Sequence, residues 1–140
     1  MLNHLGRGRF VAHSAGSHPS GTVHGLSIET LKGMGLPVDG LRSKSWDEFA
    51  APGAPPIDFI ITVCDNAAGE TCPIWPGRPI TAHWGVADPA ASSGSDDEKR
   101  AAFRTAAGIL RRRIELLLAL PLDKLETRDL QLKIRDIRAK

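Results

Sequence analysis

Apolar residues recur at helical spacing along one segment in the C-terminal half of the chain. Ser95 followed by Glu98 is a capping-box pattern, and the residues behind it keep one face apolar over several turns. The members of this face are Phe103, Ala106, Ala107, Leu110, Ile114, Leu117 and Leu118. The pattern predicts a long helix that ends before Pro121. The charged run 111–113 (Arg-Arg-Arg) is expected to lie largely on its solvent face.

Two shorter helices are predicted on either side of this segment. A helix over about residues 22–34 is indicated because Ile28 and Leu31 repeat at helical spacing and glycines follow. Beyond the long helix, Asp123 and Glu126 can cap another helix. Its apolar residues are Leu130, Ile134 and Ile137.

Short apolar runs between the helices predict strands. The clearest is residues 58–64, a continuous β-rich run that is typical of a strand buried on both faces of a parallel sheet. Shorter strands are expected at residues 9–14, 41–44 and 80–83. Strands that alternate with helices predict an α/β sandwich around a mostly parallel sheet.

Composition narrows the class of protein. A chain of 140 residues and 15.0 kDa, 41% hydrophobic and 24% charged, is an ordinary single globular domain. The net charge of +2 is too small to indicate a nucleic-acid or membrane partner. No apolar stretch approaches the ~18 residues of a membrane span, and no signal peptide is recognisable. We therefore expect no nucleic-acid partner, no membrane partner and a cytoplasmic location.

The two cysteines carry the strongest chemical signal. Cys64 ends the apolar strand, at the sheet edge where open α/β folds bind ligands, and Cys72 follows in a glycine-containing loop. In a reducing compartment such a pair favours redox or metal chemistry over a permanent bridge. A flexible connection can bring the two Cα atoms within the ~5–6 Å that a disulfide needs, so the pair suits reversible bonding. Two inert thiols, or a zinc site that includes His83, are the alternatives.

A second candidate follows the next strand and therefore belongs to the same sheet edge as Cys64. In the segment His83–Ala90, Asp88 is held by Pro89 close to Trp84. Apolar surroundings would raise the pKa of this carboxyl and suit it to general acid catalysis. An Asp-Pro pair is also a routine turn initiator.

The segments that carry these residues resemble a known family. Ser14–Gly16, which either lines a pocket or turns the chain, together with Cys64–Pro73 and His83–Ala90, is similar to the thioredoxin-coupled arsenate reductases built on the low-molecular-weight protein tyrosine phosphatase fold. The resemblance covers roughly residues 2–118. It implies a phosphatase I-like three-layer sandwich with a small parallel sheet, formed by residues 1–120, and an added helical tail of residues 121–140. It implies no cofactor.

The resemblance also implies a mechanism. In such enzymes a cysteine in an N-terminal Cys-x5-Arg-Ser loop attacks arsenate or a similar tetrahedral oxyanion, which the loop amides and the arginine bind. An aspartate matching Asp88 protonates the leaving oxygen. A cysteine matching Cys64 then attacks the first sulfur and arsenite leaves, after which one matching Cys72 attacks in turn. The resulting Cys64–Cys72 disulfide is passed to thioredoxin or another thiol reductant.

The sequence departs from this pattern before Leu2, where the first strand, the Cys-x5-Arg-Ser loop and most of the first helix are missing. Cys72 and Arg78 have the Cys-x5-Arg spacing, but prolines and a tryptophan replace the small residues that let amides converge on an anion. We therefore expect the first central strand to be absent, residues 1–140 alone to be inactive, and the natural product to start upstream of Met1. The unpaired strand edges would then be available for pairing with another copy of the chain.

Two other functions fit the same residues. A low-molecular-weight protein tyrosine phosphatase would use the Cys-x5-Arg loop and Asp88 but would not need the second thiol pair. A non-catalytic binding module would use the exposed strand edges alone.

Overall fold

A computed structural model describes residues 1–64, 75 and 77–140, and a small parallel sheet lies at its centre. Strand β1 (Phe59–Thr62) pairs with β2 (Ile80–His83), in register from Phe59 opposite Ile80 to Thr62 opposite His83. The mixed α/β class with a small parallel sheet is therefore confirmed. β2 begins and ends at the residues that the sequence predicts.

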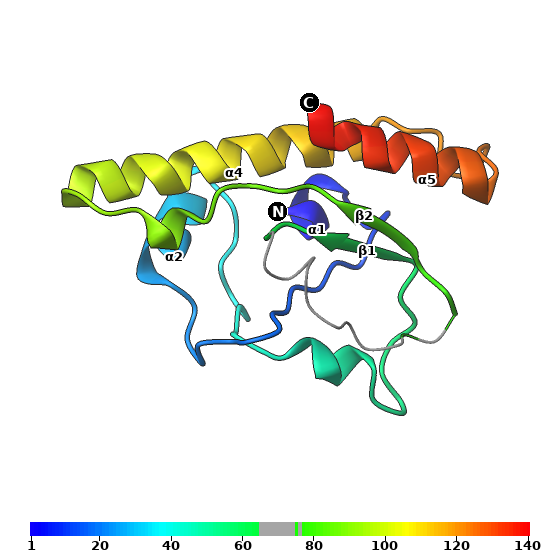
Figure 1. The fold of residues 1–140 in the computed structure, drawn as a ribbon, viewed down its shortest axis with the longest axis horizontal. Helices are drawn as coiled ribbons and strands as arrows, with labels where there is room; N and C mark the ends of the chain where they lie inside the picture. Colours follow the sequence, from blue (N-terminus) through cyan, green and yellow to red (C-terminus); the bar gives the residue numbers. More distant parts are fainter. Residues whose placement is uncertain (65–74, 76) are drawn as a thin grey trace.

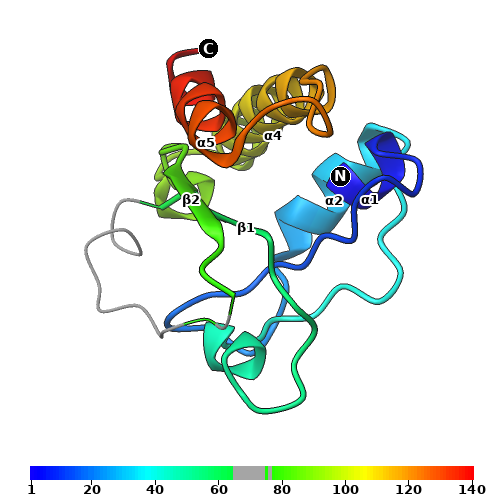
Figure 2. The ribbon, with the colours of Figure 1, turned by 90° about the vertical axis from the view of Figure 1, so that its right-hand side faces the viewer.

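The helices of the described residues flank this sheet. They are α1 (Leu2–Leu5), α2 (Gly25–Gly33), α4 (Asp96–Leu118) and α5 (Thr127–Asp136), with the short 3-10 turns η1 (Trp46–Phe49), η2 (Pro89–Ala91) and η3 (Ile137–Ala139). Both ribbon views place α4 and α5 along one side of the β1–β2 pair (Figure 1, Figure 2). None of the described helices is both long and apolar enough to cross a membrane.

The main core lies between the sheet and the two C-terminal helices. Its buried members are Ala82, Trp84, Leu117, Leu130, Ile134 and Ile137. Leu117 of α4 and Ile134 of α5 are 1% and 0% exposed, and the indole Nε1 of Trp84 donates a hydrogen bond to the Ile134 carbonyl at 2.9 Å. Residues 121–140 thus pack on the sheet and contribute part of its core. The domain boundary at residue 120 stays a prediction.

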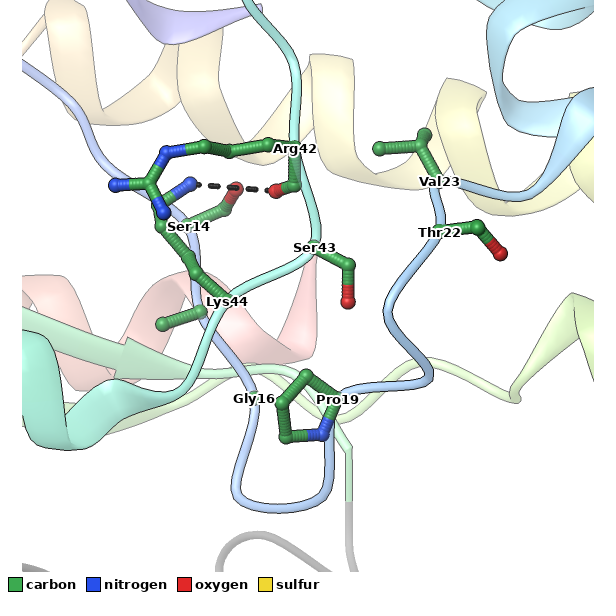
Figure 3. A pocket seen from close by; sticks show the side chains of 9 residues that line it. Ser14, Gly16, Pro19, Thr22, Val23, Arg42, Ser43 and Lys44 are labelled. Atoms are coloured by element: carbon green, nitrogen blue, oxygen red, sulfur yellow. Dashed lines mark hydrogen bonds between the residues drawn. The ribbon is translucent and has the colours of Figure 1, made fainter.

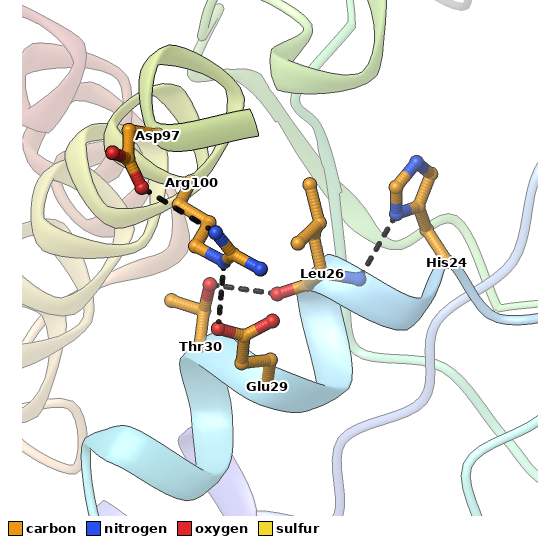
Figure 4. Close-up of polar contacts among 6 residues, drawn as sticks. All are labelled: His24, Leu26, Glu29, Thr30, Asp97 and Arg100. Carbon is orange, nitrogen blue, oxygen red and sulfur yellow. Dashed lines mark hydrogen bonds and ion pairs between the residues drawn. The ribbon is translucent and has the colours of Figure 1, made fainter. Parts of the chain in front are cut away.

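The N-terminal end of α4 is fixed by its cap and by α2. The Ser95 hydroxyl accepts a hydrogen bond from the Glu98 amide at 3.2 Å, as the capping-box pattern predicts. Further along α4, Arg100 forms an ion pair with Glu29 of α2 at 3.0 Å and with Asp97 at 3.4 Å (Figure 4). These contacts hold α2 beside the first turns of α4.

α2 begins at Gly25, three residues later than the sequence pattern predicts. The reason is the side chain of His24, whose Nδ1 accepts a hydrogen bond from the Leu26 amide at 3.1 Å (Figure 4). The same ring lies 4.7 Å from the ring of Phe103 on α4, measured between centroids. His24 therefore caps α2 and also packs it against α4.

The predicted strands at residues 9–14 and 41–44 are not formed. Among the described residues, this region contains only an isolated parallel bridge between Gly16 and Ser45. The side chain of Asn3 instead satisfies the backbone of Ala12, accepting from its amide at 2.7 Å and donating to its carbonyl at 3.0 Å. The Asn3 side chain thus makes two hydrogen bonds to the Ala12 backbone of the kind that a neighbouring strand would make.

The prediction that the strand over residues 58–64 is buried on both faces is also wrong. Every residue of β1 is half-buried, and Val63 just beyond it is 40% exposed. β1 has only one described strand beside it, and α4 and α5 lie on one side of the pair. An apolar run of this kind is therefore covered on one face rather than on two.

Candidate functional site

Cys64 and Asp88 leave the sheet at the same edge. β1 and β2 are parallel and end side by side, and the backbone pairing continues beyond them. The Trp84 amide donates to the Thr62 carbonyl and the Val86 amide donates to the Val63 carbonyl, both at 2.8 Å. The residue before Cys64 is thus bonded to a residue only two positions before Asp88. The shared edge predicted from the sequence is confirmed, whereas the roles of the two side chains stay predictions.

Asp88 is exposed and forms part of a turn. Its Oδ1 accepts a hydrogen bond from the Ala90 amide at 2.9 Å, so it caps the 3-10 turn η2. The apolar surroundings predicted for this carboxyl are not formed, because Trp84 points into the core and is only 2% exposed. The turn-forming role of the Asp-Pro pair is therefore realised, and the carboxylate remains accessible to a ligand.

The thiol of Cys64 belongs to a half-buried residue, and Cys72 lies outside the described residues. On the far side of that segment, Arg78 is exposed, with a φ of 50°, and is followed within two residues by β2. A phosphate-binding Cys-x5-Arg loop would lead into a helix N-terminus. The strand after Arg78 supports the view that its spacing from Cys72 is accidental.

His83, the residue considered for a zinc site, is the last residue of β2. Its Nδ1 lies 2.7 Å from the hydroxyl of Thr62, its partner across the sheet, and the two groups are hydrogen-bonded. Within residues 1–64, 75 and 77–140, no group of three or more His, Cys, Asp or Glu side chains is arranged to hold a metal ion.

Ser14–Gly16 line a groove, one of the two roles that the sequence suggests for them. The groove has a volume of about 240 Å³, and Ser14, Arg42 and Lys44 lie along the same part of it (Figure 3). Its remaining lining residues are Ala15, Gly16, Pro19, Thr22, Val23 and Ser43. It offers hydroxyl groups and one amine to a small polar ligand.

Both cations that line this groove already have partners, because Lys44 Nζ donates to the Arg42 carbonyl at 3.4 Å and Arg42 is paired with a carboxylate (Figure 3). Arg42 donates two hydrogen bonds of 2.8 Å to the carboxylate of Glu48. The bonds raise the pKa of Arg42 above its ordinary value and lower the pKa of Glu48 below its own. An anion in the groove would have to compete with Glu48 for this guanidinium.

Arg113 is a residue that the sequence pattern does not single out, because the run 111–113 is expected to lie largely on the solvent face. Arg113 is only 8% exposed, and it donates hydrogen bonds to the carbonyls of Trp84, Gly85 and Arg138. The helical spacing of position 113 does indicate that its side chain lies on the buried face of α4. Position 113 lies seven residues after Ala106 and four before Leu117, which both belong to the buried face of α4.

Comparison with known proteins places this arrangement in a family. The family model described as low molecular weight phosphotyrosine protein phosphatase matches residues 1–129. The chain belongs to this family. The matched residues of this phosphatase-family chain include both strands of the sheet, the edge with Cys64 and Asp88, and all of α4.

Curated relatives of this family member are arsenate reductases. The protein of that name from Halalkalibacterium halodurans is 32% identical over 103 residues, which cover 74% of this chain and 70% of the relative. The arsenate reductase of Bacillus subtilis (strain 168) is 32% identical over 85 residues, 59% of this chain and 58% of the relative. A "glutaredoxin arsenate reductase" from Synechocystis sp. is 28% identical over 115 residues, 82% of this chain and 79% of the relative. The chain thus spans less than two thirds of the Bacillus subtilis protein.

Proposed function

We propose that this chain carries the redox relay of an arsenate reductase, with Cys64 and Cys72 as the relay thiols and Asp88 as the general acid. The observation that carries the proposal is the continued pairing of Val63 with Val86, which brings the chain on either side of Cys64 and Asp88 to one edge of the sheet. The arsenate reductases among the relatives support the choice of substrate.

The chemistry needs two electrons. Arsenic acid becomes arsenous acid plus one water molecule when two thiols give up two electrons and two protons and leave as a disulfide. The first thiol attacks arsenate: a sulfur–arsenic bond forms, an arsenic–oxygen bond breaks, and Asp88 protonates the oxygen that leaves as water. Cys64 then attacks the first sulfur. A sulfur–sulfur bond forms, and the sulfur–arsenic bond breaks with its electron pair on arsenic, which leaves as arsenous acid. Cys72 then attacks Cys64, which releases the first thiol and leaves the Cys64–Cys72 disulfide.

The first thiol in this scheme belongs to a Cys-x5-Arg-Ser loop, and the 140 residues contain Cys64 and Cys72 as their two cysteines. We therefore propose that a polypeptide of residues 1–140 alone does not reduce arsenate. The reductant of the disulfide is a dithiol protein such as thioredoxin, with glutaredoxin the alternative that one relative's name suggests. We place the reaction in the cytoplasm, where reduced dithiols are regenerated.

The relay can be tested on residues 1–140 without arsenate. Mild oxidation with diamide should remove two hydrogens, seen by mass spectrometry as an intramolecular disulfide, and neither Cys64→Ser nor Cys72→Ser should form it. Thioredoxin, its reductase and NADPH should then reduce the disulfide, with NADPH consumption followed by its ultraviolet absorbance. A parallel reaction with glutaredoxin and glutathione identifies the preferred reductant. Oxidised protein that neither system reduces would refute the relay.

The substrate is tested by arsenite release from residues 1–140 extended at the N-terminus by an engineered segment that carries a Cys-x5-Arg-Ser loop. Cys64→Ser and Cys72→Ser should each abolish release coupled to thioredoxin, and Asp88→Asn should lower kcat by roughly 10²-fold or more. A phosphatase would instead keep its rate of phosphoester hydrolysis in both cysteine variants. Appreciable arsenite release by residues 1–140 alone would refute the proposal that the short polypeptide is inactive.

A further inference from the structure

Arg113 occupies an unusual position for an arginine. Its side chain crosses from α4 toward the end of β2 and is 8% exposed. Nη1 donates to the carbonyls of Trp84 and Gly85, the latter at 3.2 Å, and Nη2 donates to the carbonyl of Arg138 at 3.0 Å. One guanidinium thus joins α4, the chain after β2 and the C-terminal turn η3.

Packing stability alone does not explain this residue. Burying a guanidinium removes it from water, and within the described residues no carboxylate forms an ion pair with it. Its Nε is buried without a hydrogen-bond partner among those residues. The three carbonyl bonds offset part of this cost, because buried backbone oxygens also need donors. The side chain therefore serves the segments whose carbonyls it binds.

Those segments lead directly to the candidate site. Trp84 and Gly85 are held by Arg113 through their carbonyls, while the amides of Trp84 and Val86 bond to the chain that ends in Cys64. Asp88 follows Gly85 by three residues. The same stretch is tied to the C-terminal helix a second time, through the bond from Trp84 Nε1 to the Ile134 carbonyl.

We propose that Arg113 is a positioning residue that locks the C-terminal segment onto the Trp84–Gly85 backbone and so fixes the edge that carries Cys64 and Asp88. The proposal rests on the functional roles proposed above for those two side chains. It gives residues 121–140 a part in the reaction, since Arg138 supplies one of the three carbonyls and Ile134 holds Trp84. Arg113 itself touches neither the substrate nor the reacting sulfurs.

The test compares Arg113→Met with Arg112→Met in residues 1–140. Methionine keeps much of the length and apolar volume of Arg113 but donates no hydrogen bond, and Arg112 is the exposed neighbour on the same helix. Hydrogen exchange measured by NMR should become at least tenfold faster at the Trp84 and Val86 amides in Arg113→Met. Exchange at amides in the middle of α4 should change much less. Arg112→Met should leave all of these rates unchanged.

A second readout follows the site itself. In a Cys72→Ser background, the rate of Cys64 alkylation by iodoacetamide should rise several-fold with Arg113→Met and stay unchanged with Arg112→Met. Arg113→Lys keeps the charge and some donors but loses the planar fork. In this variant both the amide exchange rates and the Cys64 alkylation rate should return part of the way to their wild-type values. It also provides the comparison if Arg113→Met does not fold.

Three results would overturn the proposal. The first is unchanged exchange at Trp84 and Val86. The second is an equal increase at every amide, which would indicate general stabilisation only. The third is a combined result: Arg113→Met differs from wild type only in its melting temperature, and Arg113→Lys has wild-type exchange and alkylation rates. None of these measurements requires arsenate turnover, so failure of the reductase assignment and failure of the positioning role are distinguishable.

Discussion

Replacing Ile134 by alanine tests whether the segment after residue 120 belongs to the same cooperative core as the sheet. Ile134 is 0% exposed and clusters with Trp84 and Leu117. Truncating a fully buried aliphatic side chain removes its transfer free energy and leaves a cavity, which together cost about 2–5 kcal/mol. At a site this completely buried we expect a loss of about 3–4 kcal/mol, or a Tm lowered by about 10 °C. That is a large fraction of the ~5–15 kcal/mol that stabilises a typical domain.

The measurement is urea unfolding followed by far-UV circular dichroism. The midpoint should fall in Ile134→Ala while the slope m stays constant, and wild type and variant should each show a single transition. Leu132→Ala is the matched control, because Leu132 lies on the same helix but is 50% exposed, and its loss should be about 0.5 kcal/mol or less. Equal losses in the two variants, or separate transitions for the tail and the body, would refute the assignment of α5 to the core.

Two further changes test smaller features. Ser95→Ala removes the cap of α4 and should cost about 1 kcal/mol by thermal unfolding, whereas Ser93→Ala, in the loop just before the cap, should cost almost nothing; equal effects would exclude a capping role. Glu48→Gln removes the charged acceptor for Arg42, the contact that lowers the pKa of Glu48, so the small stability difference from wild type should be present at neutral pH and should vanish as the pH falls below the lowered pKa. A difference that persisted in strong acid or in high salt would show that the Arg42–Glu48 bond is not its source.

Local signals predicted the elements whose geometry depends on nearby residues. The capping serine and the apolar face were sufficient for α4, and the short β-rich run was sufficient for β2. The parallel arrangement then predicted that Cys64 and Asp88 share an edge, because the carboxyl ends of neighbouring parallel strands lie side by side. The part of the candidate site that follows from strand direction was therefore accessible from the sequence.

Features that depend on distant partners were not accessible in the same way. A strand needs a neighbour, and the β-rich residues 9–14 remain irregular where Asn3 bonds to Ala12. The run 111–113 looks like a solvated surface, yet position 113 lies on the buried side of the helix, and only the carbonyls of Trp84, Gly85 and Arg138 explain why a cation is tolerated there. Asp88 was expected beside an indole, but that indole has its own partner at Ile134.

Because Trp84 is buried, its fluorescence reports on the packing of the C-terminal helix against the sheet. Trp84 is 2% exposed, whereas Trp46 and Trp75 are half-buried and stack edge to face with ring centroids 5.9 Å apart. An indole in apolar surroundings emits at shorter wavelength and is shielded from aqueous quenchers, so iodide should quench the pair at positions 46 and 75 before it quenches Trp84. Because the Trp84 indole is bonded to α5, detachment of the C-terminal helix would appear as a red shift in this protected fraction.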